Sequence, residues 1–393
     1  MYPDERRKSR NQVGPPGKGR IRLMQVERVE TVPYALRFRE PYVTARGTLD
    51  RREMILLRLQ TDDGPEGLGE AVPLSLRDGA VLADVHKALR EAGERLVGLD
   101  LNPGPEEPLA VAVATFLELV RPRKLPPPAA AALECALFDL AAKERDEPLW
   151  ATLRAPSGAP VETNATLTAG SQAALVAQAE SWAADGFRTF KLKLGAGDDE
   201  ADVAAVREGL GPDVRIRVDA NEAWEADEAI RVLGALEELD IELAEQPVTG
   251  LRAMARVARD VAIPLAADEA VNDEADAHRA VQRSACEFVT AKLSKVGGIG
   301  TAAAIAAVIP TYLSSALDGP VGIAAAAHAV QIMRKGGTDP GIAHGLATQR
   351  LFAESVATRE CELRDGFLHL PEGPGVGVEI DEAALDRCRI DDG

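Results

Sequence analysis

The sequence lacks the marks of a membrane-bound or disulfide-rich protein. None of its apolar runs is long enough to cross a bilayer, and its first twenty residues lack the apolar core of a signal peptide. It has only four cysteines, which lie far apart, so we expect buried or idle thiols and neither a disulfide framework nor a metal clip. We therefore expect a cytoplasmic protein without a membrane partner. The cysteines are Cys135, Cys286, Cys361 and Cys388.

Positive charge is also scarce. The 393 residues include 63 acidic and 45 basic side chains, which gives a formal net charge of -18 at pH 7. A nucleic-acid partner is therefore not expected, because phosphate binding requires a basic face. Residues 1–22 are an exception: they are rich in arginine, lysine, proline and glycine, and we predict a disordered basic tail. This tail is either a phosphate-binding arm or, as we favour, a sign that Met24 is the true first residue.

Two patterns of strands and helices divide the rest of the chain. Residues 23–150 contain three strand-like runs and then helical stretches, which predicts an α+β unit with antiparallel strands and a helical layer. Over residues 151–358, strand-like runs and alanine-rich helices alternate seven times, as is typical of a parallel α/β barrel. A doubly wound open sheet is the alternative. Residues 359–393 are expected to return to the first unit with a final strand.

One strand carries the strongest chemical signal. In Phe190–Gly195, the two-residue period of a β-strand places Lys191 and Lys193 on one face and apolar side chains on the other. Buried lysines need charged partners, and charged residues do recur downstream at the ends of further strand-like runs. Counted from Lys193, the steps are 26, 26, 23 and 24 residues, the length that a parallel strand, its helix and two loops require. The residues reached are Asp219, Glu245, Asp268 and Lys292.

Three carboxylates at one mouth of a barrel suit a magnesium ion. The carboxyl ends of barrel strands face a single mouth, where active sites lie. Mg²⁺ prefers octahedral oxygen coordination, so Asp219, Glu245 and Asp268 are the expected ligands, with Mn²⁺ as an acceptable substitute. Zinc fits poorly because no histidine or cysteine lies at these strand ends. Asn221 and Glu269 neighbour ligands, and we expect them either to support those ligands or to cap helices.

The lysines beyond each end of the acidic series predict proton abstraction. Around a closed ring, Lys193 and Lys292 would face each other across the metal. One would act as base and the other would supply positive charge, while the metal takes the oxygens of a developing enolate. Lys191 would lower the pKa of Lys193. The expected partner is therefore a small-molecule carboxylate substrate.

Other interpretations stay open. A solvated alternating strand would explain Lys191 and Lys193 alone, but it does not explain the spaced set of acids. A Schiff-base aldolase would use one buried lysine and no metal, and a non-catalytic magnesium-binding barrel would keep the acids without needing the lysines. Lys295 lies in a glycine-rich segment without the Walker pattern, so we expect a tight strand-to-helix turn and not a phosphate cradle. A homo-oligomer is also left open.

The same residues resemble the enolase superfamily, in its muconate-lactonizing subgroup. The resemblance covers nearly the whole chain and implies a modified TIM barrel, (β/α)7β, with the α+β unit as a capping domain. It also implies Mg²⁺ on the three strand-end acids and catalysis by the lysines at both ends of the series. The matching motifs are Lys191-x-Lys193, Asp219-x-Asn221, Glu245-Gln246-Pro247, Asp268-Glu269, and Lys292 followed by Gly297-Gly298.

Within that subgroup, the chain looks most like the o-succinylbenzoate synthases of the menaquinone pathway. This resemblance rests on three segments, Asn164–Thr166, Ser314–Asp318 and His344–Thr348. Dipeptide epimerases usually carry an Asp-x-Asp motif at the eighth strand, where the substrate ammonium binds, whereas residues 341–348 here have no acid. The resemblance implies a dehydratase in which Lys193 removes the α-proton and Lys292 stabilises the enolate.

Other reactions of the subgroup are not excluded by this resemblance. Asp318 lies where muconate cycloisomerases often carry an acid, so that reaction stays open, as do dipeptide epimerisation and N-acylamino acid racemisation. Arg46 and Asp318 are the candidate substrate-binding residues.

Overall fold

The computed structural model describes residues 25–44, 47–62, 64–74, 79–99, 101, 109–120, 125–168, 170–195 and 197–391. The predicted tail, residues 1–22, and the candidate Arg46 lie outside the described residues. The four cysteines are free and buried. No helix within the described ranges has both the length and the apolar character that a membrane span requires.

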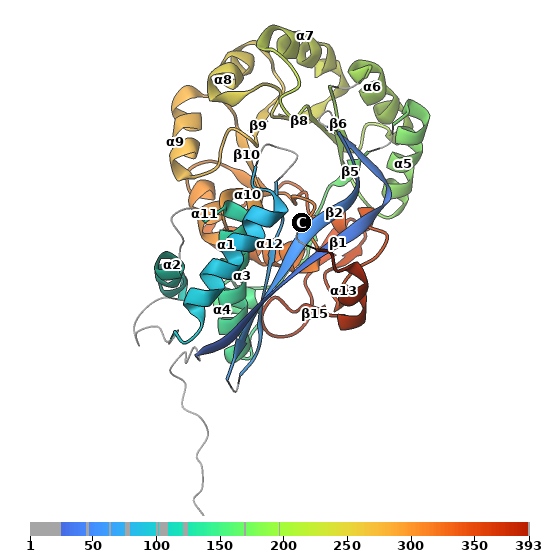
Figure 1. Cartoon of the computed structure of the whole chain (residues 1–393). Coiled ribbons are helices and arrows are strands. Elements are labelled where there is room, and N and C mark those ends of the chain that lie inside the picture. Colours follow the sequence, from blue (N-terminus) through green and yellow to red (C-terminus); the bar gives the residue numbers. More distant parts are fainter. Residues whose placement is uncertain are drawn as a thin grey trace, which may run out of the picture.

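The N-terminal part is an antiparallel sheet covered by helices, as the sequence predicts (Figure 1). Gly67 and Gly69 let strand β3 lie directly against helix α3, because a Cβ atom at either position would collide with a backbone carbonyl of that helix. We call this part, from β1 to α4, the capping domain. Its elements are β1 (Val26–Thr44), β2 (Gly47–Thr61), β3 (Gly67–Ala71), α1 (Leu82–Leu96), α2 (Leu109–Val120), α3 (Pro127–Glu144) and α4 (Leu149–Thr152).

The central part is a parallel sheet of seven strands in sequential order, from β5 to β11. Figure 1 shows helices α5 to α9 on the outside of the strands. The strands are β5 (Ala165–Leu167), β6 (Thr189–Lys193), β7 (Arg215–Asp219), β8 (Ile241–Glu245), β9 (Leu265–Ala267), β10 (Phe288–Ala291) and β11 (Thr311–Leu313). The helices are α5 (Gln172–Ala184), α6 (Asp199–Leu210), α7 (Ala226–Leu236), η2 (Glu237–Leu239), α8 (Gly250–Asp260), α9 (Glu274–Arg283), α10 (Leu293–Val296), α11 (Ile299–Ala306) and α12 (Pro320–Gly336).

Residues 344 and 345 close the barrel. His344 pairs with Thr163, next to the first barrel strand, and Gly345 pairs with Ser314, at the end of the seventh. Both pairings are parallel, so the two residues act as a very short eighth strand. The fold is therefore a (β/α)7β barrel, and the alternative of an open sheet is wrong.

The chain after the barrel returns to the capping domain. Arg389 forms a bridge with Tyr34 of β1, and Ile390 donates a backbone hydrogen bond to Pro33. β14 also pairs with the short strand β4, which precedes the barrel. The elements are β4 (Val161–Glu162), η3 (Thr348–Leu351), β12 (Ala357–Arg359), β13 (Glu362–Arg364), β14 (Phe367–His369), β15 (Glu379–Ile380) and α13 (Glu382–Cys388).

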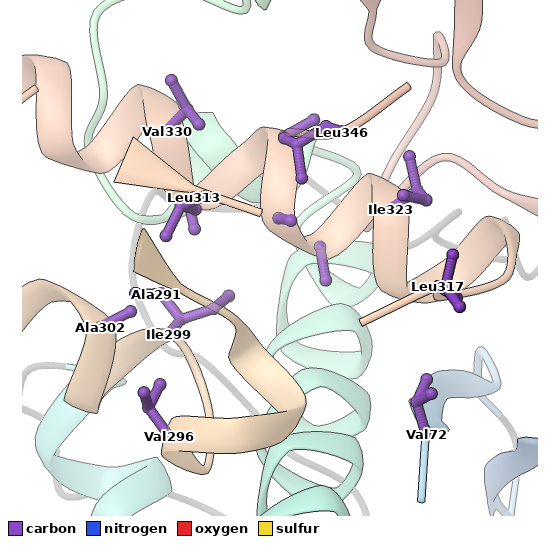
Figure 2. Packing of buried hydrophobic residues seen from close by; sticks show 14 of the residues in the cluster. Val72, Ala291, Val296, Ile299, Ala302, Leu313, Leu317, Ile323, Val330 and Leu346 are labelled. Atoms are coloured by element: carbon purple, nitrogen blue, oxygen red, sulfur yellow. The ribbon is translucent and has the colours of Figure 1, made fainter. Parts of the chain in front are cut away.

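The capping domain and the barrel share one hydrophobic core. The main cluster of buried apolar side chains contains Val72 of the capping domain as well as Leu313 of β11 and Ile323 of α12. Figure 2 shows Leu313 beneath the helix that carries Ile323, with Leu317 between them and Val72. The two parts are thus packed as a single body around the end of β11.

Candidate active site

The predicted charged residues meet at one mouth of the barrel. Lys193, Asp219 and Glu245 are the last residues of β6, β7 and β8, and the register pairs Lys193 with Asp219 and Asp219 with Glu245. Asp268 directly follows β9, and Lys292 directly follows β10. Because all these strands are parallel, their carboxyl ends lie at the same edge.

The lysines at the first end of the series are paired with acids. The Nζ atom of Lys191 lies 2.7 Å from Asp219 Oδ2 and 2.7 Å from Glu245 Oε2. The Nζ atom of Lys193 lies 2.6 Å from Asp219 Oδ2 and donates a hydrogen bond of 2.7 Å to Asn221 Oδ1. The predicted strand face is therefore real: both lysines point into the barrel, and the charged partners that their burial requires are present.

These contacts fix the charge state of two groups. Burial alone would raise the pKa of Asp219, but the nearby Lys191, Lys193 and Lys292 hold it well below its usual range. Burial alone would lower the pKa of Lys191, but Asp219 and Glu245 outweigh burial and raise it well above its usual value. Asp219 is thus an anion and Lys191 a cation at neutral pH.

At the other end of the series, two lysines bind one acid. Lys292 donates to Asp268 Oδ2, and the Nζ atom of Lys295 lies 3.0 Å from Asp268 Oδ1. Lys295 also donates to the carbonyl of Val271 at 2.9 Å. The glycine-rich segment does form a turn, but this contact of Lys295 was not predicted from the sequence. Its spacing of three residues from Lys292, one turn of a helix, is the signal that could have found it.

A second layer of polar groups holds the acids. The backbone N–H of Asn221 donates to Asp219 Oδ1 at 3.0 Å, and its side-chain amide donates to Glu269 Oε1 at 3.2 Å. The buried side chain of Gln246 accepts hydrogen bonds from the backbone N–H groups of Asp268 at 2.8 Å and Ala270 at 3.1 Å. No role was predicted for Gln246 from the sequence, although a glutamine directly after a strand-end acid is a signal that could have indicated one.

Two further buried polar residues extend this layer down the barrel. Tyr312 of β11 donates a hydrogen bond of 2.6 Å to Glu245 Oε2. The guanidinium of Arg217, a fully buried residue of β7, lies 5.0 Å from the centre of the Tyr312 ring. Both were missed. For Arg217, the alternation Arg215-Arg217-Asp219 is the available signal, since it places Arg217 on the same strand face as Asp219.

A cavity of about 90 Å³ opens above these residues, between the capping domain and the strand ends. Five basic side chains line it, and none of its described lining residues is acidic. It therefore suits an anionic ligand. The lining consists of Tyr42, Arg52, Leu74, Thr166, Lys191, Lys193, Asn221, Lys292, Lys295, Ser314, Ser315, Ala316, Leu317 and Thr348.

The candidate Asp318 lies beside this cavity and does not line it. Its Oδ2 atom accepts hydrogen bonds from the Ser315 hydroxyl at 2.8 Å and the Ala316 N–H at 2.6 Å, and its Oδ1 accepts from the Ser294 hydroxyl at 3.2 Å. Both carboxylate oxygens of Asp318 are thus hydrogen-bonded to neighbouring protein groups.

Comparisons with known proteins identify the family of this chain. The family model "Mandelate racemase / muconate lactonizing enzyme, N-terminal domain" matches residues 27–153, and "Enolase C-terminal domain-like" matches residues 174–384. The chain belongs to the muconate-lactonizing subgroup of the enolase superfamily.

Relatives in this subgroup catalyse different reactions. Muconate cycloisomerase 1-2 of Acinetobacter lwoffii is 30% identical over 94% of this chain and 96% of its own length. The o-succinylbenzoate synthase of Geobacillus stearothermophilus is 29% identical over 90% and 92%. A crystal structure of a dipeptide epimerase from Enterococcus faecalis, complexed with Mg and the dipeptide L-Leu-L-Tyr, has a TM-score of 0.82 and 27% identity over 91% of this chain and 100% of that one.

Members of this family generally bind Mg²⁺, and the acidic row of this chain offers the matching chemistry. Among the described residues, no three acidic, histidine or cysteine side chains are gathered closely enough to hold a metal ion. The lysine amines contact the acids directly. The donor set still fits a cation. All three acids are buried, Asp219 is held ionised, and Glu245 Oε1 is a buried oxygen without a hydrogen-bond partner.

Proposed function

We propose that this protein is a metal-assisted enzyme that removes the proton next to a substrate carboxylate, and that its reaction is the dehydration that forms o-succinylbenzoate. One observation carries the proposal. Lys193 ends the second strand of an eight-stranded ring and Lys292 follows the sixth, so they belong to opposite sides of the barrel, and both line one cavity. The three acids lie on the strands between them.

The acids would hold the metal ion, either Mg²⁺ or Mn²⁺. Asp219, Glu245 and Asp268 supply hard oxygen ligands, and Glu245 Oε1 is already available for a cation. Once bound, the metal supplies stabilisation of the negative charge that develops on the substrate carboxylate during proton removal. Asn221, Gln246 and Glu269 would keep the acids and their loops in place.

The lysines would move the proton and balance its charge. We assign the base to Lys193, whose Nζ atom lies at the cavity wall and is oriented by Asp219 and Asn221. The amine of Lys292 would stay protonated and face the developing enolate from the opposite side. In the dehydration, the C–H bond next to the carboxylate breaks and its proton passes to Lys193, the electrons of that bond form a C=C bond, and hydroxide leaves as water by taking up the proton that Lys193 removed.

The charge of the cavity supports this reaction over dipeptide epimerisation. An epimerase must accommodate the free ammonium group of its substrate, which calls for a nearby anion. The described lining of this cavity has five basic side chains and no acid, and residues 341–348 around the closing strand contain no acid either. A dianionic substrate without an amine, such as the o-succinylbenzoate precursor, matches that charge.

A turnover assay tests the proposal. Purified protein with Mg²⁺ should convert the precursor to o-succinylbenzoate, and EDTA should abolish turnover until Mg²⁺ is restored. Lys193→Gln and Lys292→Gln should each turn over far more slowly, whereas Lys87→Gln, which changes an exposed lysine of α1, should leave the rate unchanged. Parallel reactions with muconate, an N-succinylamino acid and L-Ala-L-Glu test the other reactions of the subgroup.

The results separate the alternatives. Turnover of L-Ala-L-Glu alone would reject the dehydration and keep the site. Borohydride trapping of a substrate adduct without any metal requirement would instead indicate a Schiff-base aldolase. If no substrate turned over and Mg²⁺ still bound, the non-catalytic barrel would be the better account.

A further inference from the structure

Two acids of the capping domain reach into the barrel, where each accepts hydrogen bonds from the first N–H groups of a barrel helix. Glu134 of α3 does so at α11, and Glu70 of β3 does so at α12. Both side chains are buried, with Glu134 at 8% and Glu70 at 4% exposure. A helix N-terminus has unpaired N–H groups and a positive end of the dipole, so a carboxylate suits it well.

Glu134 is held by the glycine-rich turn that follows Lys292. Its Oε1 atom accepts from the Gly300 N–H at 3.1 Å, and its Oε2 accepts from the Ile299 N–H. Gly298 has a φ of +132° and no room for a Cβ, which would collide with the Glu134 carboxylate. The turn that resembles a phosphate cradle in the sequence is therefore filled by an acid of the capping domain.

Glu70 is held in the same manner at the start of α12. Its Oε1 atom accepts from the N–H groups of Gly319 at 2.6 Å and Gly322 at 3.3 Å. Its Oε2 atom accepts from the hydroxyl of Tyr34 at 2.7 Å. A Cβ atom at Gly322 would lie 2.8 Å from Glu70, so the glycine is needed for this approach.

Both contacts lie beside the active cavity. Leu74, which lines the cavity from the capping domain, comes four residues after Glu70, and Ser314–Leu317, which line it from the barrel, precede Gly319. Glu134 binds the turn that comes after Lys292 and Lys295.

We propose that Glu70 and Glu134 are positioning residues that dock the capping domain on the barrel and thereby fix the two walls of the active cavity. The inference rests on the proposed function for its effect on turnover, but the docking itself can be measured without turnover. Loss of either contact would loosen the wall that binds substrate and leave Lys193 and Lys292 in place.

Isosteric substitutions test the proposal with the full-length protein. In Glu134→Gln, the amide oxygen can accept from one of the two N–H groups only, and the NH2 group meets the other donor. In Glu70→Gln, a neutral amide oxygen replaces the carboxylate oxygen that accepts from Gly319 and Gly322, which weakens both bonds, and the NH2 group meets the Tyr34 hydroxyl. Tyr34→Phe removes a single hydrogen-bond donor to Glu70 and keeps the ring. This milder variant replaces Glu70→Gln in the test if the glutamine variant fails to fold. Glu94→Gln, at an exposed position of α1, is the matched control.

Two readouts are expected to move together. For the glutamine variants, KM for the precursor should rise about tenfold or more while kcat changes less than about threefold, because substrate binding and not proton transfer is affected. Amide hydrogen exchange should accelerate about tenfold or more at Ile299 and Gly300 in Glu134→Gln, and at Gly319 in Glu70→Gln. Tyr34→Phe should give a smaller change of the same kind, and the control should give none.

The two proposals fail in different ways. Unchanged exchange at these amides, or a loss of kcat at constant KM, would overturn the positioning role. If the wild-type protein does not turn over the precursor, the proposed reaction fails, while the exchange measurement still decides whether the two acids dock the capping domain.

Discussion

Removal of the Tyr312 hydroxyl tests the buried network beneath the site. This side chain is 1% exposed, donates a hydrogen bond of 2.6 Å to Glu245 Oε2 and accepts one of 2.7 Å from the hydroxyl of Thr290. Burial, and then the charge of Glu245, raise the pKa of Tyr312 well above its usual value, so the hydroxyl keeps its proton and remains a donor. Phenylalanine keeps the ring above which Arg217 lies.

The expected cost follows from these two bonds. A hydrogen bond to a charged group contributes about 1.5–3 kcal/mol, and a neutral one contributes about 0.5–1.5 kcal/mol. Tyr312→Phe loses both, so the free energy of unfolding should fall by about 2–4.5 kcal/mol. Thr290→Val loses only the neutral bond and should cost about 0.5–1.5 kcal/mol.

Urea unfolding of both variants at neutral pH, without added metal, measures the two costs. Metal must be left out because any ion that binds the folded state would add its own stabilisation. The midpoint should shift while the m-value stays constant. The reasoning would be refuted if Tyr312→Phe cost no more than Thr290→Val.

Three further outcomes are expected. Lys193→Gln and Lys292→Gln should each lower kcat by about 10²–10⁴-fold, as measured by precursor turnover, because each removes a group that acts on the proton or its charge. Gly298→Ala should lower the free energy of unfolding by about 1–3 kcal/mol in urea, because of its φ of +132° and its contact with an acid, whereas Gly234→Ala, in an open helical position, should not. Burial lowers the pKa of His328 from 6.5 to about 4. The neutral side chain therefore contributes about 3 kcal/mol to the free energy of unfolding, fully present above pH 6.5, and this contribution should be lost as the pH falls from 6.5 through 4. Thermal melts of wild type and His328→Asn from pH 7 to pH 4 should converge if this holds, and a pH-independent difference would contradict it.

The sequence allowed the barrel and its charged strand ends to be predicted because both depend on local periodicity. The spacing from Lys193 to Lys292 reflects the length of one strand and one helix, and the two-residue period sets which side chains face inward. Because the strands are parallel and in sequential order, their carboxyl ends lie together, so no long-range contact has to be known in advance.

The contacts of individual side chains could not be predicted in this way. Tyr312 meets Glu245 across the barrel interior, so their contact depends on barrel closure and on two strands distant in sequence. Asp318 follows a strand end that lines the cavity, but the local turn directs its carboxylate to Ser294 and Ser315. The fit of Glu134 into the turn at Gly298 depends on how the capping domain packs on the barrel.

The two-residue strand that closes the ring also restricts how this enzyme can be redesigned. A side chain at Gly345 would press on Ser314, whose Oγ would lie 2.5 Å from the new Cβ atom, and would thus displace the substrate wall itself. Mutant libraries that aim to change the preferred substrate should therefore keep this glycine fixed. Substitutions are better placed at Thr166, on the first barrel strand, and at Thr348, after the closing strand, because both already line the cavity.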